Sequence, residues 1–136
     1  MFSYHRKAQY HETDKMGIIH HSNYVKWMEE TRVAFMDSIG YSFRRMELEG
    51  IASPVVSITV DYKKPVEFDD DIEARLSILR YSGAVLELGY EFYNATKEEV
   101  CTTAVSKHCF VKDGRIASLK KVLPEFDLIL GKMMDK

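Results

Sequence analysis

The sequence predicts an α+β fold in which an antiparallel sheet of about five strands wraps around one long helix. A single stretch, residues 22–39, carries apolar side chains at three- and four-residue steps, which is the period of an amphipathic helix. After residue 50 the apolar residues alternate with polar ones at a period of two, which is the period of a strand. Turn residues separate these stretches at hairpin spacing, so neighbouring strands are expected to pair antiparallel.

The chain is expected to open on a strand followed by a loop. Apolar and polar residues alternate over residues 2–10, and only Arg6 interrupts the apolar side of this strand. Residues 11–21 show no periodicity and contain both Asp14 and Gly17. This segment is therefore predicted to be a loop that leads directly into the long helix.

The long helix is expected to begin at Ser22 or Asn23, because either side chain can accept a hydrogen bond from a free N–H of the first turn. Gly40 should end it, since glycine readily adopts the left-handed conformation that closes helices. A second, short helix is predicted over residues 42–49. A final helix is predicted over residues 124–134, with a proline in its first position.

Four further strands are expected between these helices, each with alternating apolar and polar residues: 56–62, 72–78, 86–92 and 100–111. Ser82-Gly83 marks the turn between the second and third of them. Asp113-Gly114 follows the last, and this dipeptide is a strong hairpin signal.

Length and composition indicate one soluble globular domain spanning residues 1–136. The chain has 136 residues, 46% of them hydrophobic and 29% charged, which is typical of such domains. The formal net charge of −2 lacks the basic excess of a general nucleic-acid binder. No apolar run approaches the roughly 20 residues that a membrane span needs, and the N-terminus has no apolar stretch typical of a secretory signal.

The two cysteines are expected to be free thiols. Cys101 and Cys109 lie eight residues apart in one predicted strand, and this even separation places both side chains on the same face. At about 3.3 Å per residue they are too far apart to form a disulfide with each other. Free thiols are typical of a reducing compartment, so we expect a cytoplasmic protein.

A single curved sheet of this kind leaves an exposed edge strand and a poorly covered surface. Such an edge presents unpaired backbone N–H and C=O groups that readily pair with another chain. The sequence therefore predicts a homo-oligomer, and a twofold dimer is its simplest form.

The loop before the long helix combines features that suit attack on a carbonyl group. Asp14 supplies a carboxylate that can act as a nucleophile or as a general base for water. Free N–H groups and the positive end of the helix dipole lie near His21 and Ser22, where they could stabilise an oxyanion. An aspartate in a loop is more often a turn or cap residue than a catalyst, and Glu12 carries the same ambiguity.

The sequence around this loop resembles the 4-hydroxybenzoyl-CoA thioesterase family of hotdog-fold proteins. The resemblance rests on Glu-Thr-Asp-x-Met-Gly at residues 12–17, followed by His-x-x-Tyr at 21–24 and a helix with Trp-Met-Glu at 27–29. A second signature follows at residues 60–71, Val-Asp-Tyr-Lys-Lys-Pro-Val-Glu-Phe-Asp-Asp-Asp. The similarity extends over nearly the whole chain and is greatest to small bacterial acyl-CoA thioesterases associated with the Tol–Pal cluster and with fatty-acid degradation.

The resemblance implies a hotdog fold and hydrolysis of an acyl-CoA to free acid and CoA. Asp14 matches the catalytic aspartate of the family, and His21 matches a histidine commonly found beside it. The backbone N–H near His21 would polarise the thioester carbonyl. Gly17 and Tyr24 match motif positions of the substrate site, and Trp27 is a candidate for the lining of an acyl pocket where two subunits meet.

The expected partners and cofactors follow from the same assignment. The substrate is an acyl-CoA, with acyl carrier protein as an alternative carrier, and no cofactor or metal is expected because no Cys or His pair has zinc-ligand spacing. The family further implies a dimer or a tetramer of two dimers. Several basic residues could contact the CoA phosphates, and the sequence does not choose among Lys63, Lys64, Arg80, Lys112, Arg115, Lys120 and Lys121.

Three other functions compete with thioester hydrolysis, and one of them, an interaction protein without a ligand, would require Asp14 and His21 to be coincidental. A hydratase or dehydratase of the same fold would carry a different histidine motif followed by Pro-rich residues, which this sequence lacks. A non-catalytic module that binds acyl thioesters would use the same pocket without turnover. The sequence also leaves open the acyl chain length and the choice between the nucleophilic and general-base roles of Asp14.

Overall fold

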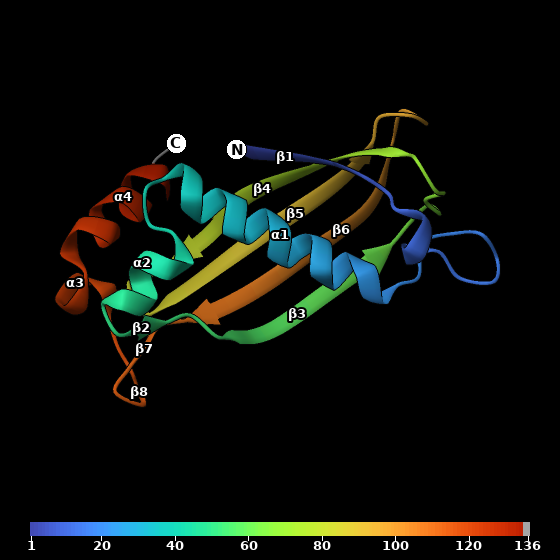
Figure 1. Cartoon of the computed structure of the whole chain (residues 1–136). Helices are drawn as coiled ribbons and strands as arrows, with labels where there is room; N and C mark the ends of the chain where they lie inside the picture. The colour runs from blue at the N-terminus through green and yellow to red at the C-terminus, as the bar shows by residue number, and fades with distance from the viewer. Residues whose placement is uncertain (135–136) are drawn as a thin grey trace.

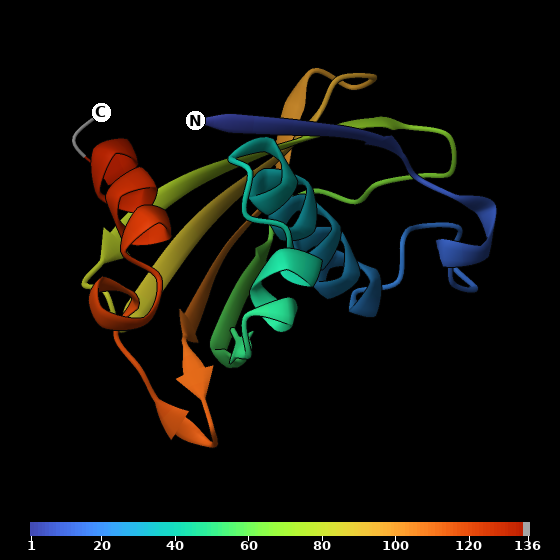
Figure 2. The same cartoon turned by 60° about the vertical axis from the view of Figure 1, so that its left-hand side comes forward.

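A curved antiparallel sheet holds one long helix, α1 (Ser22–Ser38), in its concave face (Figures 1 and 2). The computed structural model describes residues 1–134. The main sheet has five strands in the order β1-β4-β5-β6-β3, and every neighbouring pair is antiparallel. The α+β class and the sheet wrapped around one helix are therefore confirmed.

The strands of the main sheet are β1 (Phe2–Lys7), β3 (Val55–Tyr62), β4 (Asp71–Tyr81), β5 (Val85–Asn94) and β6 (Glu99–Cys109). A second, small sheet consists of β2 (Ile51–Ala52), β7 (Val111–Lys112) and β8 (Arg115–Ile116). The remaining elements are η1 (Tyr10–Glu12), α2 (Phe43–Leu48), α3 (Leu119–Val122) and α4 (Pro124–Met134). Among the described residues, no helix has the length and apolar character needed to cross a membrane.

The hydrophobic core lies between α1 and the concave face of the sheet. The apolar stripe of α1 packs here, with Trp27, Phe35 and Met36 almost fully buried. Every second residue of β5 is buried against this stripe, including Leu88 and Phe92. The two periods predicted from the sequence therefore meet in one core, since the helical stripe covers the buried face of the strands.

The predicted boundaries of two strands are wrong at one end. The first strand ends at Lys7 and not at residue 10, because Gln9 and Glu12 form a capping box that turns the chain into η1. The last long strand ends at Cys109, and Val111 belongs to the small sheet instead. The Asp113-Gly114 hairpin is confirmed as the turn between β7 and β8.

The predicted placement of the two cysteines on one face is also wrong. The pairing of β5 with β6 shifts at one point, because Phe92 pairs with Thr102 whereas Tyr93 pairs with Val100. Cys101 is therefore the extra residue of a β-bulge, and a bulge changes the alternation of side chains along a strand. Cys101 is fully buried while Cys109 is only half-buried, and both are free thiols as predicted.

The start of α1 differs from the prediction that Ser22 or Asn23 caps it. The helix begins at Ser22, His21 is the N-cap residue, and its side chain accepts no capping hydrogen bond. His20 takes this role, because its Nδ1 atom accepts the N–H of Ser22 at 3.2 Å. Gly40 does end the helix, with φ of 83° in the left-handed region.

A buried polar pair joins α1 to the sheet. Arg32 Nη1 donates to His108 Nδ1 at 2.8 Å, so His108 Nε2 carries the proton that is shared with Ser106 Oγ at 2.7 Å. Arg32 also donates to Glu29 Oε1 at 2.8 Å. Burial, together with the positive charge of Arg32, lowers the pKa of His108 to about 3.

We expect acid to destabilise the protein through His108. The unfolded chain binds a proton at the ordinary histidine pKa, whereas folded His108 excludes it until about pH 3. The free energy of unfolding should therefore fall as the pH drops below about 6.5, by up to about 1.4 kcal/mol per pH unit from this residue. Urea unfolding at several pH values measures the slope, and His108→Gln should make it shallower. Equal slopes in the two proteins would refute this assignment.

Candidate active site

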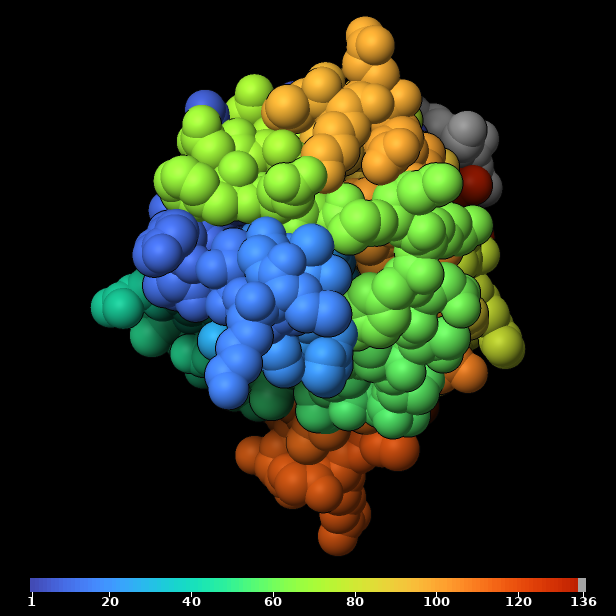
Figure 3. Space-filling view, turned by 90° about the vertical axis from the view of Figure 1, so that its right-hand side faces the viewer, coloured from blue at the N-terminus to red at the C-terminus, as the bar shows by residue number. Residues whose placement is uncertain are grey.

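Residues 13–19 form a tight loop directly before α1. An antiparallel bridge between Thr13 and Ile19 closes its base, and a second bridge joins Ile18 to Glu67. In the space-filling view of Figure 3 the loop lies beside the segment that follows β3. The loop is therefore held on two sides, by its own base and by a segment about fifty residues further along the chain.

Asp14 lies at the turn of this loop and is half-buried. Its Oδ1 atom accepts the N–H of Met16 at 2.8 Å, and its backbone oxygen accepts the N–H of Gly17 at 3.1 Å. Gly17 has φ of 78°, a conformation that glycine adopts at little cost. The turn thus occupies one carboxylate oxygen, and Oδ2 makes no hydrogen bond to any residue of 1–134. The turn role and a chemical role are compatible in this geometry.

At the entrance of α1, the backbone N–H groups of His20 and Ser22 have hydrogen-bond acceptors, whereas that of His21 has none among residues 1–134. The N–H of His20 donates to Glu12 O at 2.9 Å, and the N–H of Ser22 donates to His20 Nδ1. The His21 N–H has no acceptor within the described part of the chain, while the His21 carbonyl accepts the Tyr62 hydroxyl at 3.2 Å. An unused donor at the positive end of a helix is suited to binding a developing oxyanion.

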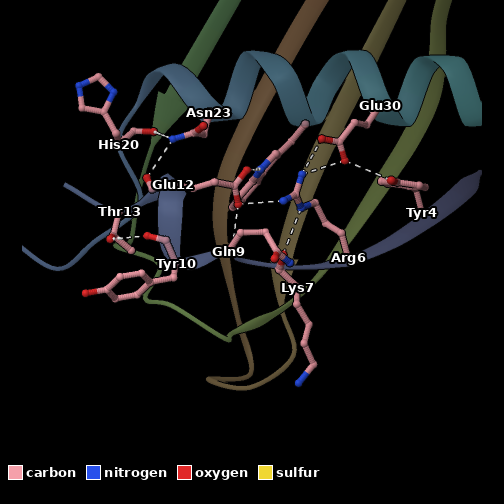
Figure 4. Close-up of polar contacts among 11 residues, drawn as sticks. Tyr4, Arg6, Lys7, Gln9, Tyr10, Glu12, Thr13, His20, Asn23 and Glu30 are labelled. Atoms are coloured by element: carbon pink, nitrogen blue, oxygen red, sulfur yellow. Dashed lines mark hydrogen bonds and ion pairs between the residues drawn. The ribbon is translucent and has the colours of Figure 1, made fainter.

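Glu12 connects the loop to the rest of the fold (Figure 4). The residue is 4% exposed, and its two carboxylate oxygens accept from Arg6 Nη2, Gln9 N and Trp27 Nε1, each at 2.8 Å. Its backbone oxygen accepts from Asn23 Nδ2 at 2.9 Å as well as from the N–H of His20. One residue therefore joins β1, η1 and the first two turns of α1, two positions before Asp14.

Arg6 explains why the apolar side of the first strand is interrupted. Its guanidinium bonds Glu12 and also donates to both oxygens of Glu30, at 2.8 and 2.6 Å. It also lies over the Trp27 ring, 4.8 Å from the centroid. Two carboxylates and an aromatic face compensate the charge of this partly buried arginine. Arg6 can therefore lie on the inward side of the strand with the apolar residues.

Behind the helix entrance lies a cluster of aromatic side chains. The Tyr24 ring is 4.9 Å from Trp27 and 5.2 Å from Tyr62, and Tyr62 is 6.3 Å from His21. Tyr24 and Trp27 are buried within the single chain, whereas Tyr62 is 51% exposed. Burial raises the pKa of Tyr24 above its ordinary value, which further favours the protonated hydroxyl.

The structure brings the sequence-predicted site residues to one end of the molecule, although in different settings. Asp14, Gly17 and His21 lie in the loop and at the helix entrance, open to solvent to different degrees. Tyr24 and Trp27 lie behind them as core residues, so their predicted contact with substrate stays a prediction.

Two residues of this end were not chosen from the sequence. Tyr62 lies in the second family signature, but its contact with His21 depends on β3 ending beside the helix entrance. Glu12 was noted only as a carboxylate with an ambiguous role. Its burial and its bonds to Arg6 and Trp27 separate it from Asp14, and no local sequence signal contains that information.

The chain matches the model of the thioesterase-like superfamily over residues 8–126, and it belongs to that family. The expected family, the hotdog arrangement and the activity class of a thioester hydrolase acting on acyl-CoA are thereby confirmed. A site built from a loop carboxylate and a helix entrance is compatible with this class.

Particular relatives agree with this assignment. The chain is 34% identical to the Bacillus subtilis protein YneP, whose name proposes an acyl-CoA thioesterase, over 88% of each chain. It is 27% identical to the acyl-CoA thioester hydrolase YbgC of Escherichia coli O157:H7, over 70% of this chain and 71% of YbgC. The crystal structure of a DHNA-CoA thioesterase from Staphylococcus aureus superposes with a TM-score of 0.93 and 30% identity, covering 98% of this chain and 90% of that one.

Proposed function

We propose that this protein hydrolyses an acyl-CoA thioester with Asp14 as its catalytic carboxylate and the His21 N–H as the oxyanion donor. The observation that supports this most is that Asp14 has a carboxylate oxygen free of hydrogen bonds within the described residues and that the entrance of α1 has an unused backbone donor. A carboxylate and a preorganised N–H are the two groups that acyl transfer to water requires.

In the general-base route, Asp14 takes a proton from water as the water oxygen attacks the thioester carbonyl. The carbonyl oxygen becomes an oxyanion that accepts from the His21 N–H, and the C–S bond then breaks to release the CoA thiolate. In the nucleophilic route, Asp14 itself attacks the carbonyl carbon, the C–S bond breaks with loss of the CoA thiolate, and an anhydride forms. Water then hydrolyses the anhydride, which releases the free acid and regenerates the Asp14 carboxylate. A thiol with a pKa near 8.5 is a good leaving group, so neither route needs a strong acid at sulfur.

A single-turnover experiment tests this proposal against the binding-module alternative. With protein in excess over acyl-CoA, an enzyme releases one free thiol per substrate, which a thiol reagent detects. A binding module instead gives a saturable complex from which the intact thioester is recovered. The panel should include DHNA-CoA, because the similar Staphylococcus aureus protein is named for that substrate. It should also include acyl groups on acyl carrier protein, because the sequence does not decide between CoA and this protein as the carrier.

We further propose that two chains pair through β3. This strand is an edge of the main sheet. The residues of β3 that lie on the same face as the buried residues of β6 are apolar. Ile58 and Tyr62 on that face are 37% and 51% exposed. Antiparallel self-pairing about a twofold axis would use the free backbone groups and place both apolar faces on the same side. A tetramer of two such dimers is the larger assembly we propose.

We expect a charge at the centre of this edge to separate the subunits. Ile58→Lys would bury an unpaired ammonium group between the two β3 strands, which is strongly unfavourable. Light scattering after gel filtration should show the monomer mass, with the circular dichroism of the folded chain. Ser3→Lys, on the opposite edge strand β1, is the matched control and should stay oligomeric. An unchanged mass for Ile58→Lys would mean that β3 is not the interface.

We also propose a cytoplasmic location and two residues that contact the CoA phosphates. Two free thiols, one of them buried with its pKa raised to about 11 by burial, suit a reducing compartment such as the cytoplasm. Lys63 and Lys64 directly follow Tyr62, beside the candidate site. Of the basic residues considered for the CoA phosphates, we therefore propose these two.

A further inference from the structure

We infer that Asn23 is a positioning residue that orients the backbone N–H of His21, the proposed oxyanion donor, relative to Asp14. This inference rests on the proposed function. Asn23 lies in the first turn of α1 and is 7% exposed. Its side chain donates hydrogen bonds to backbone carbonyls that precede the helix, which is the reverse of a capping interaction. Asn23 therefore acts on the reaction through the backbone and not by contact with the substrate.

The carboxamide of Asn23 holds the peptide group that carries the His21 N–H. This N–H and the carbonyl of His20 belong to the same peptide group, which is planar and trans, so the two point in opposite directions. The His20 carbonyl accepts from Asn23 N at 3.0 Å and from Asn23 Nδ2 at 3.2 Å. Two donors in the first turn of α1 thus fix the direction of the carbonyl, and the His21 N–H points away from this turn.

The same carboxamide joins the two ends of the loop that contains Asp14. Asn23 Nδ2 also donates to the backbone oxygen of Glu12 at 2.9 Å, and Figure 4 shows Asn23 between Glu12 and His20. Glu12 lies two positions before Asp14, and His20 directly precedes His21. The carboxamide has two N–H donors, and each is used on one side of the loop. Asn23 thereby fixes the spacing between the segment that carries the carboxylate and the segment that carries the donor.

These two side-chain hydrogen bonds are not needed to satisfy the carbonyls. The Glu12 oxygen also accepts the N–H of His20 at 2.9 Å, and the His20 oxygen also accepts the N–H of Asn23 at 3.0 Å. An apolar side chain at position 23 would therefore leave both carbonyls hydrogen-bonded. The contribution of the carboxamide is geometric, because a second donor at each carbonyl restricts the direction of its peptide group.

Asn23→Leu tests this role, because leucine is branched like asparagine but has no donor. We expect kcat to fall about ten- to hundredfold, since a displacement of about 1 Å at a reacting centre has an effect of this order. KM should stay within about threefold, because the N–H stabilises the oxyanion more than the ground-state carbonyl. Asn23→Ala removes the same donors without added volume and should behave alike. An unchanged kcat in both folded variants would overturn the inference.

Thr31→Val is the matched control for the loss of a buried hydrogen bond in α1. Thr31 is fully buried, and its hydroxyl donates to the backbone oxygen of Trp27 at 2.7 Å, further along the helix. This variant should unfold at a lower temperature than the wild-type protein but keep its kcat. Equal losses of kcat in Thr31→Val and Asn23→Leu would mean that Asn23 acts through stability alone, and the inference would be wrong.

A double-mutant cycle shows whether Asn23 acts through the His21 N–H. His21→Pro removes this N–H, and the φ of −54° at His21 suits proline, whereas His21→Ala is the reference that keeps the N–H. Asn23→Leu should lower kcat strongly in the His21→Ala protein and by less than about twofold in the His21→Pro protein. Equal losses in the two backgrounds would exclude a role through this donor.

The carbonyl stretching frequency of the bound thioester gives a readout that does not depend on turnover. The Asp14→Asn protein should hold the intact substrate, and the probe is whichever of acetyl-CoA, palmitoyl-CoA and benzoyl-CoA the wild-type protein cleaves fastest. A hydrogen bond to the carbonyl lowers this frequency, so Asn23→Leu in the Asp14→Asn background should raise it; an unchanged frequency would contradict the inference. Failure of the wild-type protein to cleave any thioester would instead count against the proposed function, so the two failures are distinguishable.

Discussion

Asp14→Asn should lower kcat by about a hundredfold to ten-thousandfold, the usual contribution of a general acid or base. The amide cannot take a proton from water and is a poor nucleophile, so both proposed routes lose their reactive group. The asparagine oxygen can still accept the Met16 N–H, so the turn should persist and the protein should unfold at nearly the wild-type temperature. Steady-state thiol release and thermal unfolding of the same preparation measure both quantities.

Asp113→Asn provides the matched control for this variant. Asp113 is also a turn residue followed by glycine, but it lies in the β7–β8 hairpin at the other end of the chain. Asparagine tolerates its left-handed conformation, with φ of 54°, so neither stability nor turnover should change much. Equal kcat values for the Asp14→Asn and wild-type proteins would remove Asp14 from the mechanism.

Glu12→Ala should destabilise the fold by about 3 kcal/mol, because removal of one member of a buried ion pair leaves the other poorly compensated. The variant leaves the Trp27 Nε1 proton and the Gln9 N–H without their acceptor, and Arg6 keeps only Glu30. For a domain of this size the midpoint of thermal unfolding should fall by about 10 °C. The measurement should use one fixed protein concentration, because oligomers unfold in a concentration-dependent way.

Lys7→Ala is the comparison that isolates the effect of burial. It removes the partner of Asp69 in an exposed ion pair, in which both side chains are largely accessible to water. Exposed pairs contribute about 0–1 kcal/mol, so the midpoint should move by a few degrees at most. Similar shifts for the two variants would show that the Glu12 contacts add little beyond an ordinary surface pair.

The helices and the order of strands along the chain follow from local sequence patterns, because period and turn chemistry are local properties. The stripe of α1 and the Asp113-Gly114 hairpin were predictable for this reason. The expected pairing of neighbouring strands is wrong for β3 and β4, because β3 pairs with β6 and β4 pairs with β1 and β5. The placement of Cys101 was not, since a bulge appears only when β6 is aligned against β5. The end of β1 was missed because the capping box of Gln9 and Glu12 resembles ordinary polar alternation in the sequence.

The candidate site shows the same division between local and distant information. Asp14, Gly17 and His21 lie within one short motif, so the resemblance located them together. The role of Glu12 depends on Arg6 and Trp27, which reach it from another strand and from the helix. Two carboxylates in one loop look alike in sequence, and only the burial of Glu12 and its donors separates the structural acid from the candidate catalyst.

The most direct measurement of the central claim is the rate of thiol release by the wild-type protein across an acyl-CoA panel, from acetyl to palmitoyl with benzoyl added. We expect at least one class to be cleaved with kcat/KM of about 10⁴ M⁻¹s⁻¹ or more, as is usual for an enzyme on its own substrate. A folded, oligomeric protein that binds these thioesters and cleaves none of them would contradict thioester hydrolysis and favour a binding module.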